Sequence, residues 1–310
     1  MIKLGSFMMP LHPPEKNRTE CFEEDAEFVM LADRLGFTEA WFGQHHTLAW
    51  EPIPANDIFI ANLISRTKNI RLGTGVSIIP QHHPANIAVR IAFLDHLARG
   101  RLNCGFGQGG VATDWGLFEL PDPQTQGLMT VEAIDMILKL WQTDAPFDLE
   151  GDFWHIKIEH RDVKSGMGEL LKPYQKPHPP LWQVVDSTSS IEWAAKNQIN
   201  CIMWIPTVKT LKQRFEIYKK AKSEAEKRDV PMGEGISLVR DMFVADTMED
   251  AKKLAGEQMV NYMKWVCHWR GLGNHLDPGE ELPKTKGKLD LLNYDFLHKR
   301  NMLFGTPDYV

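Results

Sequence analysis

The chain has 310 residues, of which 43% are hydrophobic and 25% charged, so it holds enough apolar material for a sizeable core. Its formal charge of −6 argues against nucleic acid or an anionic membrane as the main partner. No apolar stretch reaches the roughly 18 residues of a membrane span, and MIKLGSFMMP is too short and polar for a signal peptide, so we expect neither.

The four cysteines are scattered, and none of them forms a C-x-x-C pair (Cys21, Cys104, Cys201, Cys267). This spacing fits buried thiols in a reducing compartment better than a disulfide framework or a zinc site. We therefore expect a cytoplasmic protein.

Strands and helices are predicted to alternate about every 30 residues, the spacing of βα units. In the first half, strands are predicted at 3–9, 38–42, 70–79 and 102–106. Helices are predicted from Thr19, over 57–66, around 87–98 and over 131–141. Residues 144–180 break the alternation with a hairpin pattern and a Pro-rich stretch, which we interpret as an insertion.

The alternation resumes with strands at 181–185, 201–205 and 237–245 and helices over 187–196, around 211–221 and from Thr247. Seven such units favour a (β/α)8 TIM barrel over a doubly wound sheet. Residues 271–302 have no clear period and are predicted to form a mobile lid. Thr306 and Pro307 are helix-start signals near the end. We therefore expect the chain to stop before its last βα elements, with at least one more strand needed to close the barrel.

Barrel enzymes place their sites at the carboxyl ends of the strands. Five histidines lie at such ends (His12, His45, His46, His82, His83), as do GFGQGG (105–110), DSTSS (186–190) and Trp204. The Gly-rich turn fits either a tight βα turn or an anion cradle, and DSTSS either a helix cap or a phosphate cradle. Their places on adjacent loops favour phosphate binding.

The histidines leave several interpretations open. A catalytic metal needs three or four converging ligands, and no carboxylate at a predicted strand end completes such a set, so we expect no metal. The rings are either hydrogen-bonded for structure, or at least one of them moves a proton or anchors a ligand, because histidine titrates near neutral pH.

Six stretches resemble one family, in its own order along nearly the whole chain: MMPLHPP (8–14), LADRLGFTEAWFGQHH (31–46), RTKNIRLGTGVSIIPQHHP (66–84), LDHLARGRLNCGFGQGG (94–110), STSSIEWAAK (187–196) and LFGTPDYV (303–310). On these stretches the chain resembles the bacterial-luciferase-like flavin-dependent monooxygenases, and most of all their limonene-monooxygenase-like branch. The resemblance implies a single TIM-barrel domain over 1–310. It also implies binding of reduced FMN, its reaction with O2 to a flavin (hydro)peroxide, and transfer of one oxygen to an organic substrate.

The resemblance also assigns site roles. The family's paired histidines map onto His45 and His46, the first near the reactive flavin, with Gln44 beside them. A strained, often cis, peptide after strand three maps onto Gly75-Val76. Contacts to the flavin and its phosphate map onto two loops and one aromatic residue (Gly107, Gln108, Gly109, Gly110; Asp186, Ser187, Ser190; Trp204).

Three positions depart from the luciferase α subunit. Gln44 stands where that chain has an acidic residue, Gly107 where it has a reactive cysteine, and Gln108 where it has a phosphate-binding arginine. These departures argue against light emission and predict that FMN is held more weakly, through backbone and hydroxyl groups. Weak holding fits a two-component enzyme that receives reduced FMN from a separate flavin reductase.

We therefore expect a homodimeric, two-component monooxygenase in which His45 positions or protonates the flavin–oxygen adduct, while His46 and Gln44 fix the ring. Its substrate is expected to be a small apolar molecule, because several methionines and tryptophans fall near the strand ends, although these could equally pack in the core (Met8, Met9, Trp50, Trp115, Trp204). The alternatives are a deazaflavin-dependent oxidoreductase of the same superfamily, a metal-dependent hydrolase barrel and a non-catalytic flavin-binding subunit.

Overall fold

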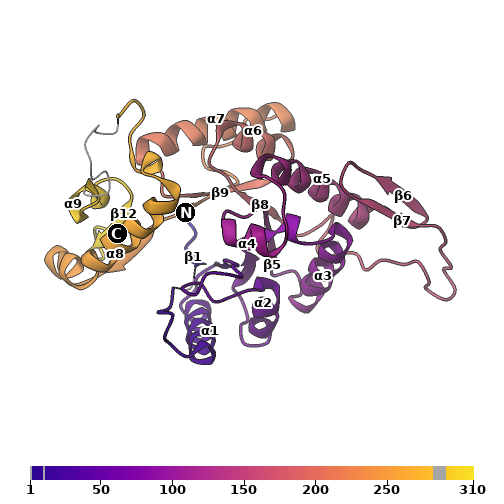
Figure 1. Cartoon of the computed structure of the whole chain (residues 1–310), viewed down its shortest axis with the longest axis horizontal. Helices are drawn as coiled ribbons and strands as arrows, with labels where there is room; N and C mark the ends of the chain where they lie inside the picture. The colour runs from indigo at the N-terminus through magenta and orange to yellow at the C-terminus, as the bar shows by residue number, and fades with distance from the viewer. Residues whose placement is uncertain (1, 10, 282–290) are drawn as a thin grey trace. The chain divides into compact units, whose positions relative to one another are not determined.

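The computed structural model describes residues 2–9, 11–281 and 291–310 (Figure 1). Contacts between residues divide the chain into two compact units, Met1–Val184 and Val185–Val310. In both units helices alternate with strands that pair in parallel, as the sequence predicts, apart from one antiparallel hairpin in the first unit.

The first unit holds most of the predicted βα elements. Its strands and helices are β1 (Gly5–Met8), α1 (Arg18–Arg34), β2 (Glu39–Phe42), α2 (Asn56–Ile64), β3 (Arg71–Thr74), β4 (Ser77–Ile78), the 3-10 turn η1 (Ile79–Gln81), α3 (Pro84–Leu97), β5 (Leu102–Gly107), α4 (Ala112–Leu117), α5 (Pro123–Gln142), β6 (Phe147–Glu150), β7 (His155–Ile158) and β8 (Leu181–Val184).

The strands of the first unit form a parallel sheet in the order β1-β2-β3-β5-β8. The register pairs Gly5 with Glu39 and Glu39 in turn with Arg71. Because all neighbours run in parallel, their carboxyl ends meet at one edge, where the loops 43–55, 75–83 and 108–111 begin. Strands β2, β3 and β5 are nearly continuous buried runs, as expected of strands covered on both faces.

Strand three is not continuous, contrary to the prediction for residues 70–79. It is divided into β3 and β4 at the Gly75-Val76 peptide, which is cis. After this break β4 pairs with β5, with Ser77 opposite Phe106. The hydrophobic pattern continues through the break and therefore does not reveal it.

Strand β5 runs unusually close to β3 and β4. A Cβ atom on Gly105 would lie 2.1 Å from the carbonyl oxygen of Thr74, and one on Gly107 would lie 2.7 Å from Cγ2 of Val76. The Thr74 hydroxyl donates to the Gly105 carbonyl oxygen and accepts from the Gly105 N–H, both at 2.9 Å. These two glycines are therefore required by sheet packing.

The helices of the first unit differ from prediction in one region. Helix α5 begins at Pro123, where Asp122 accepts hydrogen bonds from the backbone of Gln124 and Thr125, well before the predicted start at 131. The short helix α4 before it was not predicted. The predicted hairpin in residues 144–180 is confirmed as the antiparallel pair β6–β7, which lies beyond α5 in Figure 1.

The second unit contains α6 (Thr188–Lys196), β9 (Asn200–Trp204), α7 (Val208–Glu226), β10 (Ile236–Val239), β11 (Asp241–Val244), α8 (Met248–Arg270), the 3-10 turn η2 (Gly273–His275), α9 (Tyr294–His298) and β12 (Met302–Gly305). Strand β10 pairs in parallel with β9, and β11 with β12. The strand predicted over 237–245 thus changes partner at Arg240, where β10 ends and β11 begins.

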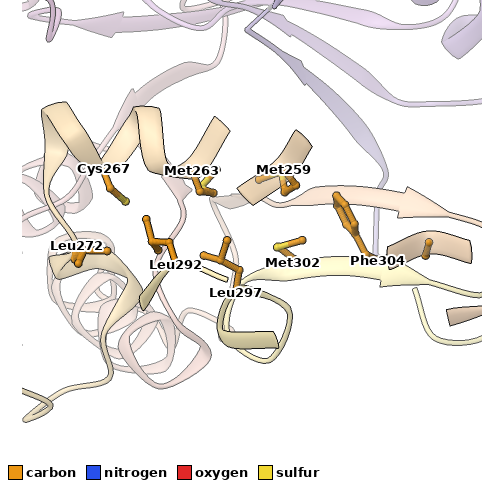
Figure 2. Close-up of a cluster of buried hydrophobic side chains, with 9 residues drawn as sticks. Met259, Met263, Cys267, Leu272, Leu292, Leu297, Met302 and Phe304 are labelled. Carbon is orange, nitrogen blue, oxygen red and sulfur yellow. The ribbon is translucent and has the colours of Figure 1, made fainter. Parts of the chain in front are cut away.

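The core of the second unit lies between α8 and β12 (Figure 2). Met259, Met263 and Cys267 recur every four residues and so line one face of α8. They pack near Met302 and Phe304 of β12, a strand that was not predicted and that begins at the last residue of the aperiodic stretch 271–302. The four cysteines are all buried, as predicted.

The predicted lid, residues 271–302, is anchored where it is described. Leu272, Leu292 and Leu297 belong to the core beneath α8. The buried Asn301 amide donates to the Ile205 carbonyl oxygen and contacts His275 Nδ1, both at 2.7 Å. Residues 282–290 of the predicted lid lie outside the described residues. In the described ranges no helix is both long and apolar enough to cross a membrane.

The packing of β5 generates a test. Gly105→Ala is expected to lower the free energy of unfolding by about 3 kcal/mol or more, because its Cβ meets backbone that cannot move aside. Gly116→Ala in α4, where the new Cβ meets nothing within 4 Å, is the control and should be neutral or stabilising. Chemical denaturation measures both, and equal effects would show that β5 has room to adjust.

Candidate functional site

The imidazole of His45 lies between two buried carboxylates. Its Nε2 is 3.0 Å from Oε2 of Glu51, and its Nδ1 is 3.6 Å from Oδ2 of Asp114. The two acidic side chains are 3% and 2% exposed, and that of His45 is 17% exposed. Each ring nitrogen therefore lies within ion-pair distance of a carboxylate that is almost out of contact with water. Neither contact has the alignment of a hydrogen bond, since His45 Nδ1 and both oxygens of Glu51 have no hydrogen-bonding partner.

The loop that follows β2 brings Glu51 back to His45. The His45 N–H donates to the Ile53 carbonyl oxygen at 3.1 Å, which closes the loop, and the Glu51 N–H donates to the Leu48 carbonyl oxygen at 3.2 Å. The chain after β1 fixes the same loop from outside, because the His12 N–H donates to the Trp50 carbonyl oxygen at 2.9 Å. Glu51 is thus positioned by backbone hydrogen bonds on both sides.

Asp114 comes from α4 and holds the loop from the other side. Its carboxylate accepts from the N–H groups of His46 and Thr47, at 3.2 and 2.9 Å, and from the Thr47 hydroxyl at 2.5 Å. Burial alone would raise the pKa of Asp114, but its contacts with His45 and Thr47 outweigh burial and lower the pKa to about 2. Asp114 is therefore a carboxylate at neutral pH.

These contacts determine the charge of His45. A neutral imidazole carries one N–H and can donate to only one of two flanking carboxylates, whereas the imidazolium can donate to both. Burial lowers the pKa of His45, but Asp114 and Glu51 overcome that effect and raise it to about 9. The geometry thus favours a positively charged ring at neutral pH.

His46 has different neighbours. Its Nε2 lies 3.1 Å from Oε1 of Gln81 and 3.3 Å from Nε2 of Gln44, and its ring meets Phe118 edge to face at 4.7 Å between centroids. Gln44, which is buried, therefore contacts the second histidine of the pair. The structure thus links 44–46 to the turn η1 as well as to α4.

The cis peptide that was predicted at Gly75-Val76 is present and is tied to the end of β2. The Gly75 N–H donates to the Phe42 carbonyl oxygen at 2.7 Å. The buried Asn56 amide donates to the carbonyl oxygens of Phe42 and Val76, both at 3.1 Å. Residues 75–76 therefore lie beside the start of the histidine loop within the first unit.

The Gly-rich turn connects β5 to the helix that carries Asp114. Gly107 packs on Val76, and Gly109 has φ +80°, where a Cβ atom would lie 3.0 Å from Cγ2 of Ile78, so both glycines fit a tight turn. Gln108 donates to the Pro123 carbonyl oxygen at 3.4 Å, and Gly110 is exposed. A phosphate-binding role for this turn stays a prediction.

Two of the other strand-end histidines have structural partners. Nε2 of His12 is 3.0 Å from the buried Asp25 carboxylate, and His83 caps α3 by accepting from the Ala85 N–H at 3.2 Å. Burial and the nearby Arg90 lower the pKa of His82. Across the described part of the chain, no group of three or more His, Cys, Asp and Glu side chains is arranged to hold a metal ion.

In the second unit the predicted phosphate loop is a helix cap. Ser187 Oγ accepts from the Ser190 N–H, and Ser190 Oγ accepts from the Ser187 N–H, both at 3.2 Å, which is a reciprocal capping box at the start of α6. Asp186 lies 3.6 Å from Arg214 of α7, and Trp204 ends β9 half-buried. Binding roles for these residues stay predictions.

Sequence reasoning missed four residues of the first unit: Glu51, Asp114, Asn56 and Gln81. Glu51, Asp114 and Asn56 lie outside the quoted motifs and the predicted strand ends, whereas Gln81 lies in the stretch 66–84, directly before the histidines at 82 and 83 that drew attention instead. The one available signal was charge in an apolar setting, since Glu51 is the only acid in TLAWEPIP. Such a residue is buried only when it has a partner.

Comparison with known proteins identifies the family of this chain. The family model described as luciferase-like monooxygenase matches residues 2–310. The chain is similar to 2,5-diketocamphane 1,2-monooxygenase 1 of Pseudomonas putida, with 26% identity over all of this chain and 86% of that protein. It is 30% identical to the oxygenase component of the flavin-dependent trigonelline monooxygenase of Acinetobacter baylyi, over 80% of this chain and 66% of the relative.

A partial match supports the predicted branch. Limonene 1,2-monooxygenase of Rhodococcus erythropolis is 37% identical over 45% of this chain, although the match spans only 36% of that enzyme.

Solved structures show the fold. The oxygenating constituent of 3,6-diketocamphane monooxygenase from Pseudomonas putida, solved with FMN, has a TM-score of 0.84 at 21% identity, over all of this chain and 86% of that one. The coenzyme F420-dependent tetrahydromethanopterin reductase of Methanopyrus kandleri has a TM-score of 0.69 at 17% identity, over 100% and 88% of the two chains. The predicted α/β barrel class is confirmed, and the chain belongs to the luciferase-like monooxygenase family.

Proposed function

We propose that this chain is the oxygenase of a two-component, FMN-dependent monooxygenase that acts on a small apolar substrate. The observation that carries the proposal is the half-buried His45, which lies between the buried Glu51 and Asp114 at the strand ends of a monooxygenase-family chain. A relative named as an oxygenase component and a structural neighbour solved with FMN support the same assignment. We further propose that the protein is a homodimer and acts in the cytoplasm.

Buried polar atoms in the first unit fit a flavin. Among the described residues, Gln81 Nε2, Trp115 Nε1 and Asn56 Oδ1 are buried without a hydrogen-bonding partner, and unsatisfied polar atoms of this kind call for a ligand or water. Gln81 and Asn56 belong to the network around His46 and the 75–76 peptide. A flat ring system with hydrogen-bonding edges suits such donors and acceptors.

The residues proposed to hold FMN are those that the family resemblance indicated. In the first unit they are Gly75, Val76, Gly107, Gln108, Gly109 and Gly110, and in the second unit Asp186, Ser187, Ser190 and Trp204. When bound, reduced FMN supplies the two electrons that reduce one oxygen atom of O2 to water while the other enters the substrate.

The protein's own residues then have defined tasks. His45 presents an N–H beside the reacting atoms and holds a proton there, because its carboxylate neighbours stabilise the charged ring. His46, Gln44 and Gln81 keep the adjoining loop in one arrangement. Buried Phe42 and Met8 exclude water from the carboxyl ends of β1 and β2.

A direct test supplies reduced FMN, isotopically labelled O2 and a panel of terpenes, aldehydes, ketones and aromatics, with and without a flavin reductase. One labelled oxygen atom in a product is expected, with oxygen consumption above that of free reduced flavin. A parallel arm supplies a reduced deazaflavin without oxygen. Turnover in that arm alone would identify an F420-type oxidoreductase and contradict the proposal.

His45 is tested by the coupling of oxygen use to product. His45→Gln is expected to lower the product formed per reduced FMN by about tenfold or more, an effect of ~1.4 kcal/mol, because the charged ring beside the reacting atoms is lost, and to release more hydrogen peroxide. His83→Gln, which alters a cap of α3, is the control and should retain coupling. Unchanged coupling in folded His45→Gln would remove His45 from the reaction.

The serines of α6 are tested by comparing two ligands. If Ser190 contacts the phosphate, Ser190→Ala should weaken FMN binding about tenfold, an effect of ~1.4 kcal/mol, while riboflavin binding stays the same. Thr247→Ala, which removes a cap from α8, should leave both affinities unchanged. Equal effects of Ser190→Ala on FMN and riboflavin would mean that the serine only caps the helix.

A further inference from the structure

Glu51 makes the shortest contact to His45, and it lies six residues further along the same loop. Its Oε2 is 3.0 Å from Nε2 of the ring, and Glu51 is 2% exposed. A carboxylate this deeply buried requires a positive partner. His45 is the only such partner that the described part of the chain provides for Glu51.

The two sides of the ring are fixed independently. Glu51 is positioned within the loop, whereas Asp114 comes from α4 and is held by three donors other than His45: the N–H groups of His46 and Thr47 and the Thr47 hydroxyl. Neither carboxylate depends on the other for its place. Rotation of the ring would therefore move at least one nitrogen away from the carboxylate beside it.

From this geometry we propose that Glu51 is a positioning residue that, together with Asp114, holds His45 permanently as an imidazolium of fixed orientation. His45 then acts in the reaction as a fixed positive charge with a carboxylate on each side, and it does not exchange its proton with solvent at each turnover. The charge of His45 is inferred from its contacts with Glu51 and Asp114. Only the consequence of that charge for oxygen transfer rests on the proposed function.

The position directly before the histidine pair is occupied by an amide, Gln44, which contacts His46. Here an acid reaches the first histidine from Glu51, on the far side of the loop. A third carboxylate at position 44 would add negative charge to a cluster that already holds two carboxylates and one cation.

The linked effect on stability has a definite sign. The pKa of His45 is about 9 in the folded protein, above its ordinary value of 6.5. Its contribution to stability is therefore fully present below about pH 6.5 and is lost as the pH rises through about 9. The difference in unfolding free energy between the natural protein and His45→Gln should shrink over that interval.

The experiment follows the ring nitrogens of His45 by NMR in protein labelled with 15N-histidine, with the resonances assigned by their loss in His45→Gln. In the natural protein both nitrogens should carry protons at neutral pH, with a titration midpoint near 9. Glu51→Gln should lower that midpoint by at least one pH unit, a tenfold change in proton affinity. Asp25→Asn, which removes the buried carboxylate beside His12, is the matched control and should leave it unchanged.

A His45 midpoint near 6.5, or one that Glu51→Gln does not move, would overturn the inference, whatever the enzyme's activity. Oxygen-transfer assays provide the second readout. The product formed per reduced FMN should fall at high pH, and in Glu51→Gln this fall should begin at a lower pH than in the natural protein. If the NMR midpoint shifts but no reduced flavin supports oxygen transfer, the charge state stands and the proposed function fails. Unfolding curves confirm that each variant is folded.

Discussion

The carboxylate of Asp114 connects the parts of the candidate site in the first unit. It accepts hydrogen bonds from the backbone of the loop after β2 and faces the His45 ring, while it belongs to α4, the helix that follows the Gly-rich turn. Two segments nearly 70 residues apart in sequence are joined by one buried charge. Such a group is stable only if its partners are in place, so removal of any partner should disturb both segments.

The second constraint is the close approach of β5 to β3 and β4. The glycines of GFGQGG let the two backbones meet where a side chain would collide with Thr74 or Val76. This approach sets the position from which the turn enters α4 and delivers Asp114. A motif that resembled a phosphate loop in the sequence thus contributes first to packing, and a ligand would use the turn that packing has already fixed.

The histidines show that residue type and position at a strand end do not reveal which side chain has a functional environment. Five rings at strand ends looked equivalent in the sequence, yet His83 caps a helix, His12 pairs with Asp25, and only His45 has a carboxylate at each nitrogen among the described residues. The distinguishing partners come from a loop and from a helix that was not predicted. Their side chains are polar residues outside any periodic pattern, and the one local signal was the single acid, Glu51, in the apolar stretch TLAWEPIP.

The sequence by itself determined the alternation of strands and helices, the insertion hairpin, the family and the position of the histidine pair. These features follow from hydrophobic periodicity and from motifs that are contiguous in the chain. The family resemblance indicated a special peptide at Gly75-Val76, but only the tertiary structure showed that β3 and β4 are separate strands there. It alone also decided the change of partner at Arg240, the strand β12 and the two carboxylates that flank His45. Each of these depends on a neighbour distant in sequence, such as Phe106 opposite Ser77 or Asp114 beside His45. The charge on a buried ring is set by the groups that surround it, and folding alone brings those groups together.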